Sequence, residues 1–233
     1  MCDSLTALHH EIIACRRCPR LVAWREETAA KKVRRFLAEP YWGKPLPGFG
    51  SHHARLVVVG LAPAAHGGNR TGRMFTGDAS ADWLMAAMHE SGFASQPQSL
   101  SRTDGLVLHD AYITAAVRCA PPQNKPTGQE AEACAGYLAE ELNCLQPRVI
   151  LALGRFAFGS VRKYLKGLGV DVRPFLFSHG AHFELDSPYP GRLTLLASYH
   201  PSQQNTQTGK LTRPMFAEVF HMARMSLGAV QAE

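Results

Sequence analysis

Four short runs of mostly apolar residues stand out along the chain. They lie at 55–59, 111–115, 149–153 and 193–197. Continuous apolar strands that alternate with helical segments are typical of a parallel sheet covered on both faces. The pattern therefore predicts an α/β fold, a single domain with three αβα layers around a central, mainly parallel four-stranded sheet.

The segments around these strands have the length and apolar spacing of helices. Thr127 and Glu130 form a typical helix start, with Thr127 as the capping residue and a glutamate three positions later. We expect helices over four ranges: 79–91, 127–145, 155–167 and 212–228.

The first fifty residues have a different character. Residues 4–38 are expected to be helical, with an interruption near Cys18 and Pro19, and residues 40–48 are rich in helix breakers and should form an ordered loop. We expect this N-terminal helical segment, about residues 1–50, to pack on the α/β core, so that residues 1–233 make one domain.

Polar or glycine-rich residues follow each predicted strand. The four strands lead into Gly60-Leu61-Ala62-Pro63, Val117-Arg118-Cys119, Gly154-Arg155 and Ser198-Tyr199-His200-Pro201. Ligands of α/β proteins bind at the carboxyl ends of parallel strands. The functional site is therefore expected at this edge of the sheet.

Composition limits the partners and the location. Lysine and arginine exceed aspartate and glutamate by six, and the isoelectric point is about 9.1, which permits a phosphate-backbone partner without requiring one. No apolar run approaches the roughly 20 residues of a membrane-spanning helix. The first residues lack the pattern of a secretory signal, so we expect a cytoplasmic protein without a membrane partner.

Four of the six cysteines have the spacing of a metal site. Cys15 and Cys18 form a close pair, and Cys119 and Cys134 form a wide one. Such a set suits a tetrahedral zinc site or an iron–sulfur cube, and the spacing does not choose between them. Unpaired buried thiols are the alternative. The other two cysteines are expected to be non-ligands: Cys2 and Cys144.

The segment 60–78 joins a strand to a helix and contains several glycines. It lacks the Gly-Lys-Ser/Thr ending of a phosphate-binding P-loop and the glycine order of a dinucleotide fingerprint. A long surface loop is the simplest explanation. The presence of Phe75, His66, Asn69, Arg70 and Asp78 within it argues instead for a pocket.

This segment, together with 119–124 and 200–205, resembles the uracil-DNA glycosylase superfamily. The resemblance is to its iron–sulfur branch, and within that branch to family 5, the type B enzymes. Gly60-Leu61-Ala62-Pro63-Ala64 has the type B form, whereas family 4 enzymes begin this motif with Gly-Glu-Ala-Pro-Gly. The resemblance extends from Cys15 to the final helix.

The resemblance implies a monofunctional DNA glycosylase of base excision repair. Such an enzyme flips out uracil, and in type B enzymes also hypoxanthine and other deaminated or damaged bases, and leaves an abasic site. It also implies a structural [4Fe–4S] cluster held by Cys15, Cys18, Cys119 and Cys134. We expect the partner to be DNA that contains such bases, and the protein to be a monomer associated with a bacterial or archaeal nucleoid.

The resemblance further implies which residues hold the base. Phe75 would stack on the extruded base, unless it is only a core residue. Asn124 would read the polar edge of the base, although asparagine in a proline-rich loop often only forms a turn. The backbone of three neighbouring residues would supply further hydrogen bonds: Gly60, Leu61 and Ala62.

Two residues are implied to be catalytic. His200 would donate to the base as negative charge develops on it. The type B motif has apolar residues where other members place an Asp or Asn for water, so Asp78 would orient water and stabilise the sugar cation. Asp78 could equally be only the cap of the helix that follows it.

The loop after His200 would contact the DNA backbone and enter the minor groove, and a plain polar surface loop is the alternative. Its residues are Ser202, Gln203, Gln204 and Asn205. Three other functions remain open from sequence: a narrow, uracil-specific family 4-type glycosylase, a non-catalytic iron–sulfur protein that binds damaged DNA, and a zinc-stabilised nucleotide-binding module.

Overall fold

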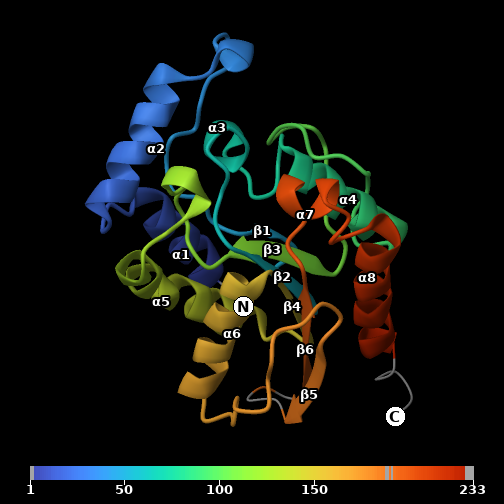
Figure 1. Cartoon of the computed structure of the whole chain (residues 1–233). Helices are drawn as coiled ribbons and strands as arrows, with labels where there is room; N and C mark the ends of the chain where they lie inside the picture. Colours follow the sequence, from blue (N-terminus) through green and yellow to red (C-terminus); the bar gives the residue numbers. More distant parts are fainter. Residues whose placement is uncertain (1–2, 187–188, 190, 229–233) are drawn as a thin grey trace.

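Six strands form one mixed sheet at the centre of the molecule, in the order β1-β3-β2-β4-β6-β5 (Figure 1). The structure is a computed structural model that describes residues 3–186, 189 and 191–228. The four central strands run parallel to one another. They are β2 (Leu56–Gly60), β3 (Ala111–Ala115), β4 (Val149–Leu153) and β6 (Arg192–Ser198). All four predicted strands are confirmed.

The predicted strand number was too small, because two antiparallel strands lie at the edges of the sheet. Strand β1 (Phe49–Gly50) has only two residues, and β5 (His182–Asp186) alternates between exposed and half-buried side chains. Neither has the continuous apolar run that marks a strand buried on both faces. The six-stranded sheet therefore contains a four-stranded parallel centre and two short edges.

Helices cover both faces of the sheet and confirm the three layers. Each of the four predicted helices is present within two residues of its expected bounds. The longer helices are α1 (Asp3–Ala14), α2 (Pro19–Lys31), α4 (Ala79–Glu90), α5 (Gly128–Leu145), α6 (Arg155–Gly167) and α8 (Arg213–Gly228). The short ones are α3 (Gly68–Thr71), α7 (Gln203–Gln207) and the 3₁₀ turns Arg34–Phe36 and Pro122–Asn124.

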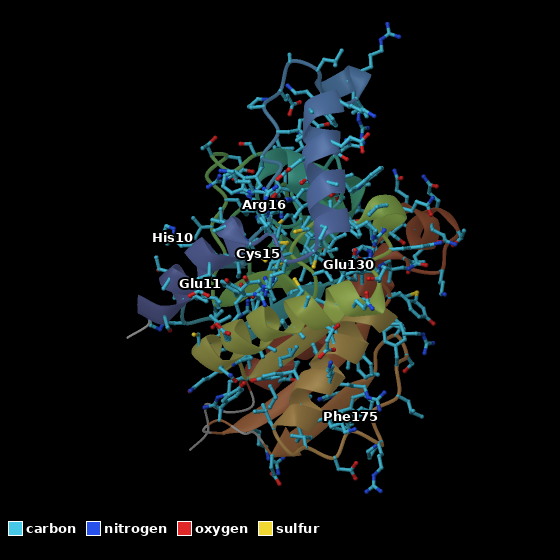
Figure 2. All side chains as sticks on the ribbon, turned by 90° about the vertical axis from the view of Figure 1, so that its left-hand side faces the viewer. His10, Glu11, Cys15, Arg16, Glu130 and Phe175 are labelled. Atoms are coloured by element: carbon cyan, nitrogen blue, oxygen red, sulfur yellow. The ribbon has the colours of Figure 1, made fainter. Side chains whose placement is uncertain are left out.

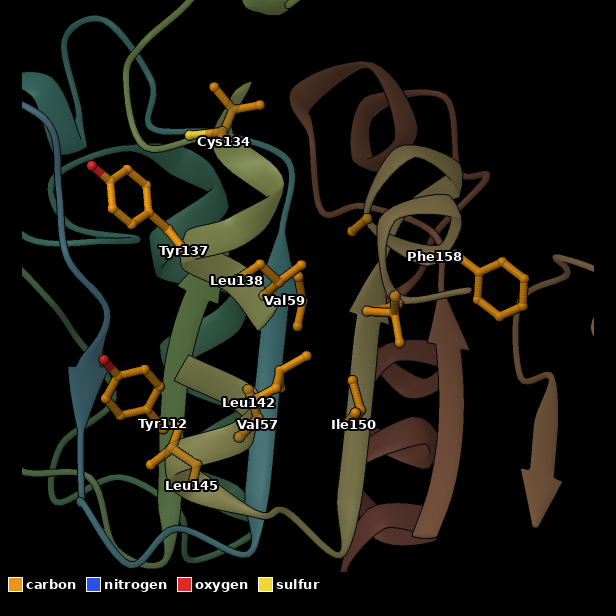
Figure 3. Packing of buried hydrophobic residues seen from close by; sticks show 14 of the residues in the cluster. Val57, Val59, Tyr112, Cys134, Tyr137, Leu138, Leu142, Leu145, Ile150 and Phe158 are labelled. Carbon is orange, nitrogen blue, oxygen red and sulfur yellow. The ribbon is translucent and has the colours of Figure 1, made fainter. Parts of the chain in front are cut away.

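Alternate residues of each central strand enter opposite cores. In β2, Val57 and Val59 pack with residues of α5 such as Leu142, whereas Leu56 and Val58 pack against α4 and α8 (Figure 3). Burial on both sides explains why the strand sequence is apolar without interruption. Among the described residues, no helix has the length and apolar character needed to cross a membrane.

The start of α5 follows the predicted capping pattern. The Thr127 hydroxyl accepts from the Glu130 N–H at 3.2 Å, and the Glu130 carboxylate accepts from the Thr127 N–H at 2.7 Å. The same carboxylate binds Arg20 of α2 at 2.6 Å. This contact, with the packing of Leu8 and Ile12 of α1 in the same core as α5, joins the N-terminal helices to the α/β core.

A fully buried ion pair fixes α5 to the sheet. Arg118 Nη2 donates to Glu141 Oε2 at 2.6 Å, and the two side chains are 1% and 0% exposed. The carboxylate also accepts from the hydroxyls of Tyr112 and Thr114 and from the N–H of Gly48. Through hydrogen bonds from these four residues, Glu141 joins the helix, strand β3 and the loop before β1.

Removing this carboxylate will destabilise the fold strongly. Glu141→Ala leaves the Arg118 charge buried without a partner, which costs about 3–5 kcal/mol of unfolding free energy. Chemical denaturation measures the loss. Glu132→Ala, in the same helix but in an exposed pair with Lys163, is the matched control and should change the free energy by less than about 1 kcal/mol. Equal effects of the two variants would contradict this account of the buried pair.

Candidate active site

The carboxyl ends of the parallel strands bring the three motifs together. After β2 and β3, Ala116 N donates to Gly60 O at 3.0 Å and Val117 N donates to Leu61 O at 2.9 Å. After β4 and β6, Gly154 N donates to Ser198 O at 2.8 Å. These backbone hydrogen bonds place the residues that follow each strand side by side at one edge of the sheet.

Phe75 lies at this edge in a strained conformation. Its φ angle is +45°, a region that bulky residues rarely adopt. Its ring covers Gly60 so closely that a Cβ at position 60 would be 2.7 Å from the ring. The ring also lies beside that of His200, with centroids 6.0 Å apart and planes tilted by 30°. Phe75 thus joins the first and third motifs.

His200 follows β6 and is held through its backbone. Asn205 Nδ2 donates to His200 O at 2.8 Å, and the N–H of Leu211 in turn donates to Asn205 O at 3.0 Å. Burial lowers the pKa of the His200 imidazole from its ordinary value to about 4. The ring is therefore neutral at ordinary pH and can still donate one N–H.

The predicted DNA-contacting loop forms the first turn of a short helix. Ser202 caps α7 by accepting from the Asn205 N–H at 3.4 Å, while Gln203 and Gln204 are exposed. Asn205 therefore has a structural role, because its side chain binds the His200 backbone. The side chains of Gln203 and Gln204 are exposed to solvent. The four residues stand directly beside the candidate catalytic histidine.

Asn124 lies on the 3₁₀ turn that follows β3. Gln123 and Asn124 both have positive φ, 54° and 56°, so the turn is sharply bent. Asn124 is exposed, and its side-chain amide has no hydrogen-bond partner among the described residues. The structure does not link it by a contact to Phe75 or His200.

Asp78 caps helix α4, as its alternative role predicted. Its Oδ1 accepts from the Ala81 N–H at 3.0 Å. The other oxygen lies against Gly67, where a Cβ would be 2.0 Å away, so the site requires glycine at position 67. Burial raises the pKa of the Asp78 carboxyl, and the capping N–H groups and Arg70 oppose that shift. The structure therefore shows Asp78 as a partly buried helix cap.

A pocket of about 380 Å³ opens beside Leu61 and His200. Of its lining residues, only Leu61, His200 and Asn205 were predicted site residues; the others include two cations and two aromatic residues, Arg155, Lys210, Phe177 and Tyr199. Each cation lies over an aromatic ring, Arg155 over Phe177 at 5.2 Å and Lys210 over Tyr199 at 4.9 Å. Of these, the sequence pointed only to Arg155 and Tyr199, because both follow predicted parallel strands, where ligand sites are expected.

The four predicted cysteine ligands converge from three segments. Cys15 and Cys18 lie between α1 and α2, opposite the start of α5 (Figure 2), and Cys134 projects from α5 (Figure 3). Burial raises the pKa of the thiols of Cys18, Cys119 and Cys134, to about 12 for Cys119, and the negative charge of Cys15 raises each further. Arg25 joins two of the segments, because its guanidinium donates to Cys119 Sγ at 2.9 Å and to Cys15 O at 3.2 Å.

Two N–H groups point at these sulfur atoms. Arg25, only 2% exposed, donates from Nη1 to Cys119 Sγ at 2.9 Å, and the Arg118 N–H donates to Cys134 Sγ at 3.3 Å. In the described ranges, no three His, Cys, Asp or Glu side chains are arranged to hold a single metal ion. Cys144 lies elsewhere, 3.1 Å from Ser4 Oγ, and Cys2 lies outside the described residues.

The comparisons with known proteins agree with the motifs. Residues 47–224 match the model of the uracil DNA glycosylase superfamily. The chain belongs to the uracil-DNA glycosylase superfamily. A protein named Type-5 uracil-DNA glycosylase from Thermus thermophilus is 54% identical over 93% of this chain and 95% of its own length. One of the same name from Pyrobaculum aerophilum is 45% identical over 95% and 92%.

The relatives also separate the two enzyme branches considered from sequence. A protein named Type-4 uracil-DNA glycosylase from Archaeoglobus fulgidus is 33% identical over 66% of this chain and 62% of its own length. The Type-5 relatives match more closely and over nearly the full chain. The resemblance to family 5 is therefore confirmed.

The low pKa of His200 gives a testable pH dependence. Because the folded pKa is near 4 and not near 6.5, the neutral ring persists well below the pH at which ordinary histidines titrate. We expect the single-turnover rate of base release at saturating DNA to be constant between about pH 6 and 8 and to fall only in more acidic solution.

Exposed His109 provides the control, since His109→Asn should leave the whole profile unchanged. A decline centred near the ordinary histidine pKa, about 6.5, would show that His200 is not held neutral by burial.

Proposed function

We propose that the protein is a monofunctional, type B uracil-DNA glycosylase that acts as a monomer in base excision repair. It flips a damaged base out of DNA, hydrolyses the N-glycosidic bond and leaves an abasic site. The observation that carries this proposal is the meeting of Phe75 and His200 at the carboxyl edge of the sheet, 6.0 Å apart. The family indicates the class of reaction. The contact between Phe75 and His200 supports this edge of the sheet as the place where the reaction occurs.

The reaction needs stabilisation at both ends of the breaking bond. As the bond lengthens, negative charge develops on the base and positive charge on the sugar. The neutral His200 imidazole, kept neutral by burial, would donate to the base without first losing a proton. The Asp78 carboxylate, whose Oδ1 accepts from the Ala81 N–H, would orient water and stabilise the sugar cation. The structure holds no lysine in the motif segments, in line with hydrolysis without an imine intermediate.

The base would be recognised by groups from the first and second motifs. Phe75 offers a ring face already fixed against Gly60, and stacking on an aromatic ring contributes about 1–3 kcal/mol per base. The exposed amide of Asn124 offers a donor and an acceptor that no neighbour occupies among the described residues. The backbone of Gly60, Leu61 and Ala62 would add further hydrogen bonds.

The apolar first motif supports a broad substrate range. Leu61 lines the pocket beside His200, at a place where no carboxylate restricts the shape of the base. We therefore include hypoxanthine and other deaminated bases with uracil as substrates. The DNA strand would lie over the loop of residues 202–205, with Arg155 and Lys210 of the pocket as additional cations for phosphates.

The four cysteines fit a [4Fe–4S] cluster. Cys119 and Cys134 are buried and Cys15 and Cys18 are half-buried, and burial raises the pKa of the Cys18, Cys119 and Cys134 thiols. Positive iron ions would stabilise the four thiolates at such a site. The N–H groups of Arg25 and Arg118 that reach sulfur are of the kind that surround cluster ligands. Bound there, the cluster would tie α1 and α2 to the segment that leads to Asn124. Its contribution would be structural, and the residues described above would hydrolyse the N-glycosidic bond.

Metal analysis tests the cluster directly. Protein purified without oxygen should be brown, with about four iron atoms per chain and no zinc. Cys119→Ser should lose the colour and the iron, whereas Cys144→Ser, a cysteine outside the set, should keep both. A colourless wild-type protein that holds zinc would contradict the proposal.

The function is tested on synthetic duplexes that contain one uracil, hypoxanthine or xanthine. Wild-type protein should release uracil and leave alkali-sensitive abasic sites. Asp78→Asn keeps an oxygen for the α4 cap but lacks the charge, so we expect single-turnover excision to fall by about 10²-fold or more with DNA binding nearly unchanged.

Asp82→Asn, in the first turn of the same helix, is the control and should retain activity. Full activity of Asp78→Asn would remove Asp78 from the mechanism. No release of any base by the wild-type protein, together with tight binding to damaged DNA, would favour the non-catalytic function instead.

A further inference from the structure

A second buried ion pair lies next to Phe75 in the chain. Arg73 and Asp104 form two parallel hydrogen bonds, Nη1 to Oδ1 at 2.9 Å and Nη2 to Oδ2 at 2.6 Å. Their side chains are 6% and 9% exposed. The other donors of Arg73 reach Ser99 Oγ at 2.8 Å and Thr76 Oγ1 at 3.0 Å. Three side chains therefore fix the guanidinium plane.

Asp104 organises the segment that carries this contact. Its carboxylate accepts from the N–H groups of Leu100, Ser101 and Leu106 at 2.8, 3.2 and 3.0 Å. These bonds and the Arg73 guanidinium hold the pKa of Asp104 well below its ordinary value, although burial opposes the shift. The loop is thus ordered around a permanent negative charge.

The same network holds the chain on both sides of Phe75. Thr76 Oγ1 lies 3.1 Å from Met74 O, to which it donates, and 2.6 Å from Ser99 Oγ. Gly77 N donates to Ser99 O at 2.8 Å. Hydrogen bonds therefore hold Met74, Thr76 and Gly77, the residues on either side of Phe75.

That anchoring explains how the strained backbone persists. A positive φ costs a residue other than glycine about 1–2 kcal/mol, and it survives where surrounding contacts determine it. Phe75, at φ +45°, lies between Met74, whose carbonyl accepts from the Thr76 hydroxyl, and Thr76, whose hydroxyl binds Arg73 and Ser99. Without that network the chain could relax, and the ring would leave its place over Gly60.

We infer that Arg73 is a positioning residue for base excision: with Ser99 and Asp104, it holds the Phe75 ring as a preformed stacking surface before DNA binds. The inference rests on the proposed function, in which Phe75 stacks on the extruded base. Arg73, Ser99 and Asp104 themselves touch no base. A purely structural pair would instead stabilise the fold and leave the chemistry of the folded enzyme unchanged.

Arg73→Lys is the direct test, because lysine keeps the charge but cannot form the paired hydrogen bonds. We expect the single-turnover excision rate at saturating uracil DNA to fall by about tenfold or more, with binding of that DNA changed by less than about threefold. Arg55→Lys is the matched control, since Arg55 forms a similar pair with Asp110 on the surface at the start of β2. It should change neither quantity.

Ser99→Ala is the second variant, in case Arg73→Lys fails to fold. It removes one hydroxyl from the network and leaves the ion pair in place, so the rate should fall by about threefold or more. Ser95→Ala, which removes a hydroxyl bound to the Val107 N–H in the same region, is its control and should leave the rate unchanged.

A double-mutant cycle with Phe75→Ala separates positioning from stability. If Arg73 acts through Phe75, Arg73→Lys and Ser99→Ala will have no further effect on the rate once the ring is absent. Equal rate losses in both backgrounds, or normal rates in folded Arg73→Lys and Ser99→Ala proteins, would overturn the inference. Wild-type protein that releases no uracil would refute the proposed function itself, and Phe75→Ala with normal activity would refute the role of the ring.

Discussion

Parallel strands impose the constraint from which the site follows. In a parallel sheet all strands end at the same edge, so segments more than fifty residues apart in sequence must meet there. In this chain β3, β2, β4 and β6 are neighbours in that order, and each leads into one part of the site. The motif that carries Phe75 lies between the one that carries Asn124 and the one that carries His200. The order of the strands alone therefore brings the three motifs together at one edge of the sheet.

Buried charges then fix the loops that leave this edge. Glu141 ties α5 to β3 and to Arg118, the residue directly before Cys119, and Arg73 with Asp104 ties the loop of Phe75 to the 99–106 segment. Buried ion pairs often add little net stability, but they are strongly directional, and a broken pair leaves an uncompensated charge. In this protein we interpret the two ion pairs as contacts that hold the segments around Arg118 and Phe75 in one conformation. A cysteine cluster would extend the same principle to the N-terminal helices.

Sequence patterns predicted the centre of the fold well and its edges poorly. The four parallel strands and four helices were found because burial on both faces produces apolar runs, and Thr127 with Glu130 has a local capping pattern. Strands β1 and β5 pair through backbone at the exposed edges, where the pattern is weak. Phe75, Asp78 and His200 were predicted as site residues from motifs, and the structure brings the Phe75 and His200 rings within 6.0 Å of each other. The sequence did not identify Phe177, Lys210 or Asp104. They lie in loops without a local pattern, and their contacts with the site form only when the chain folds.

The central claim is that a flipped uracil lies at the edge of the sheet against Phe75. A crystal structure of the protein with a duplex that contains 2′-fluoro-2′-deoxyuridine tests it most directly, because the fluorine disfavours the sugar cation and preserves the bond. The account predicts an extrahelical base stacked on Phe75, with Asn124 at its polar edge, His200 at its carbonyl and Asp78 beside the sugar. A uracil that remains stacked in the duplex, or that occupies another part of the surface, would contradict it.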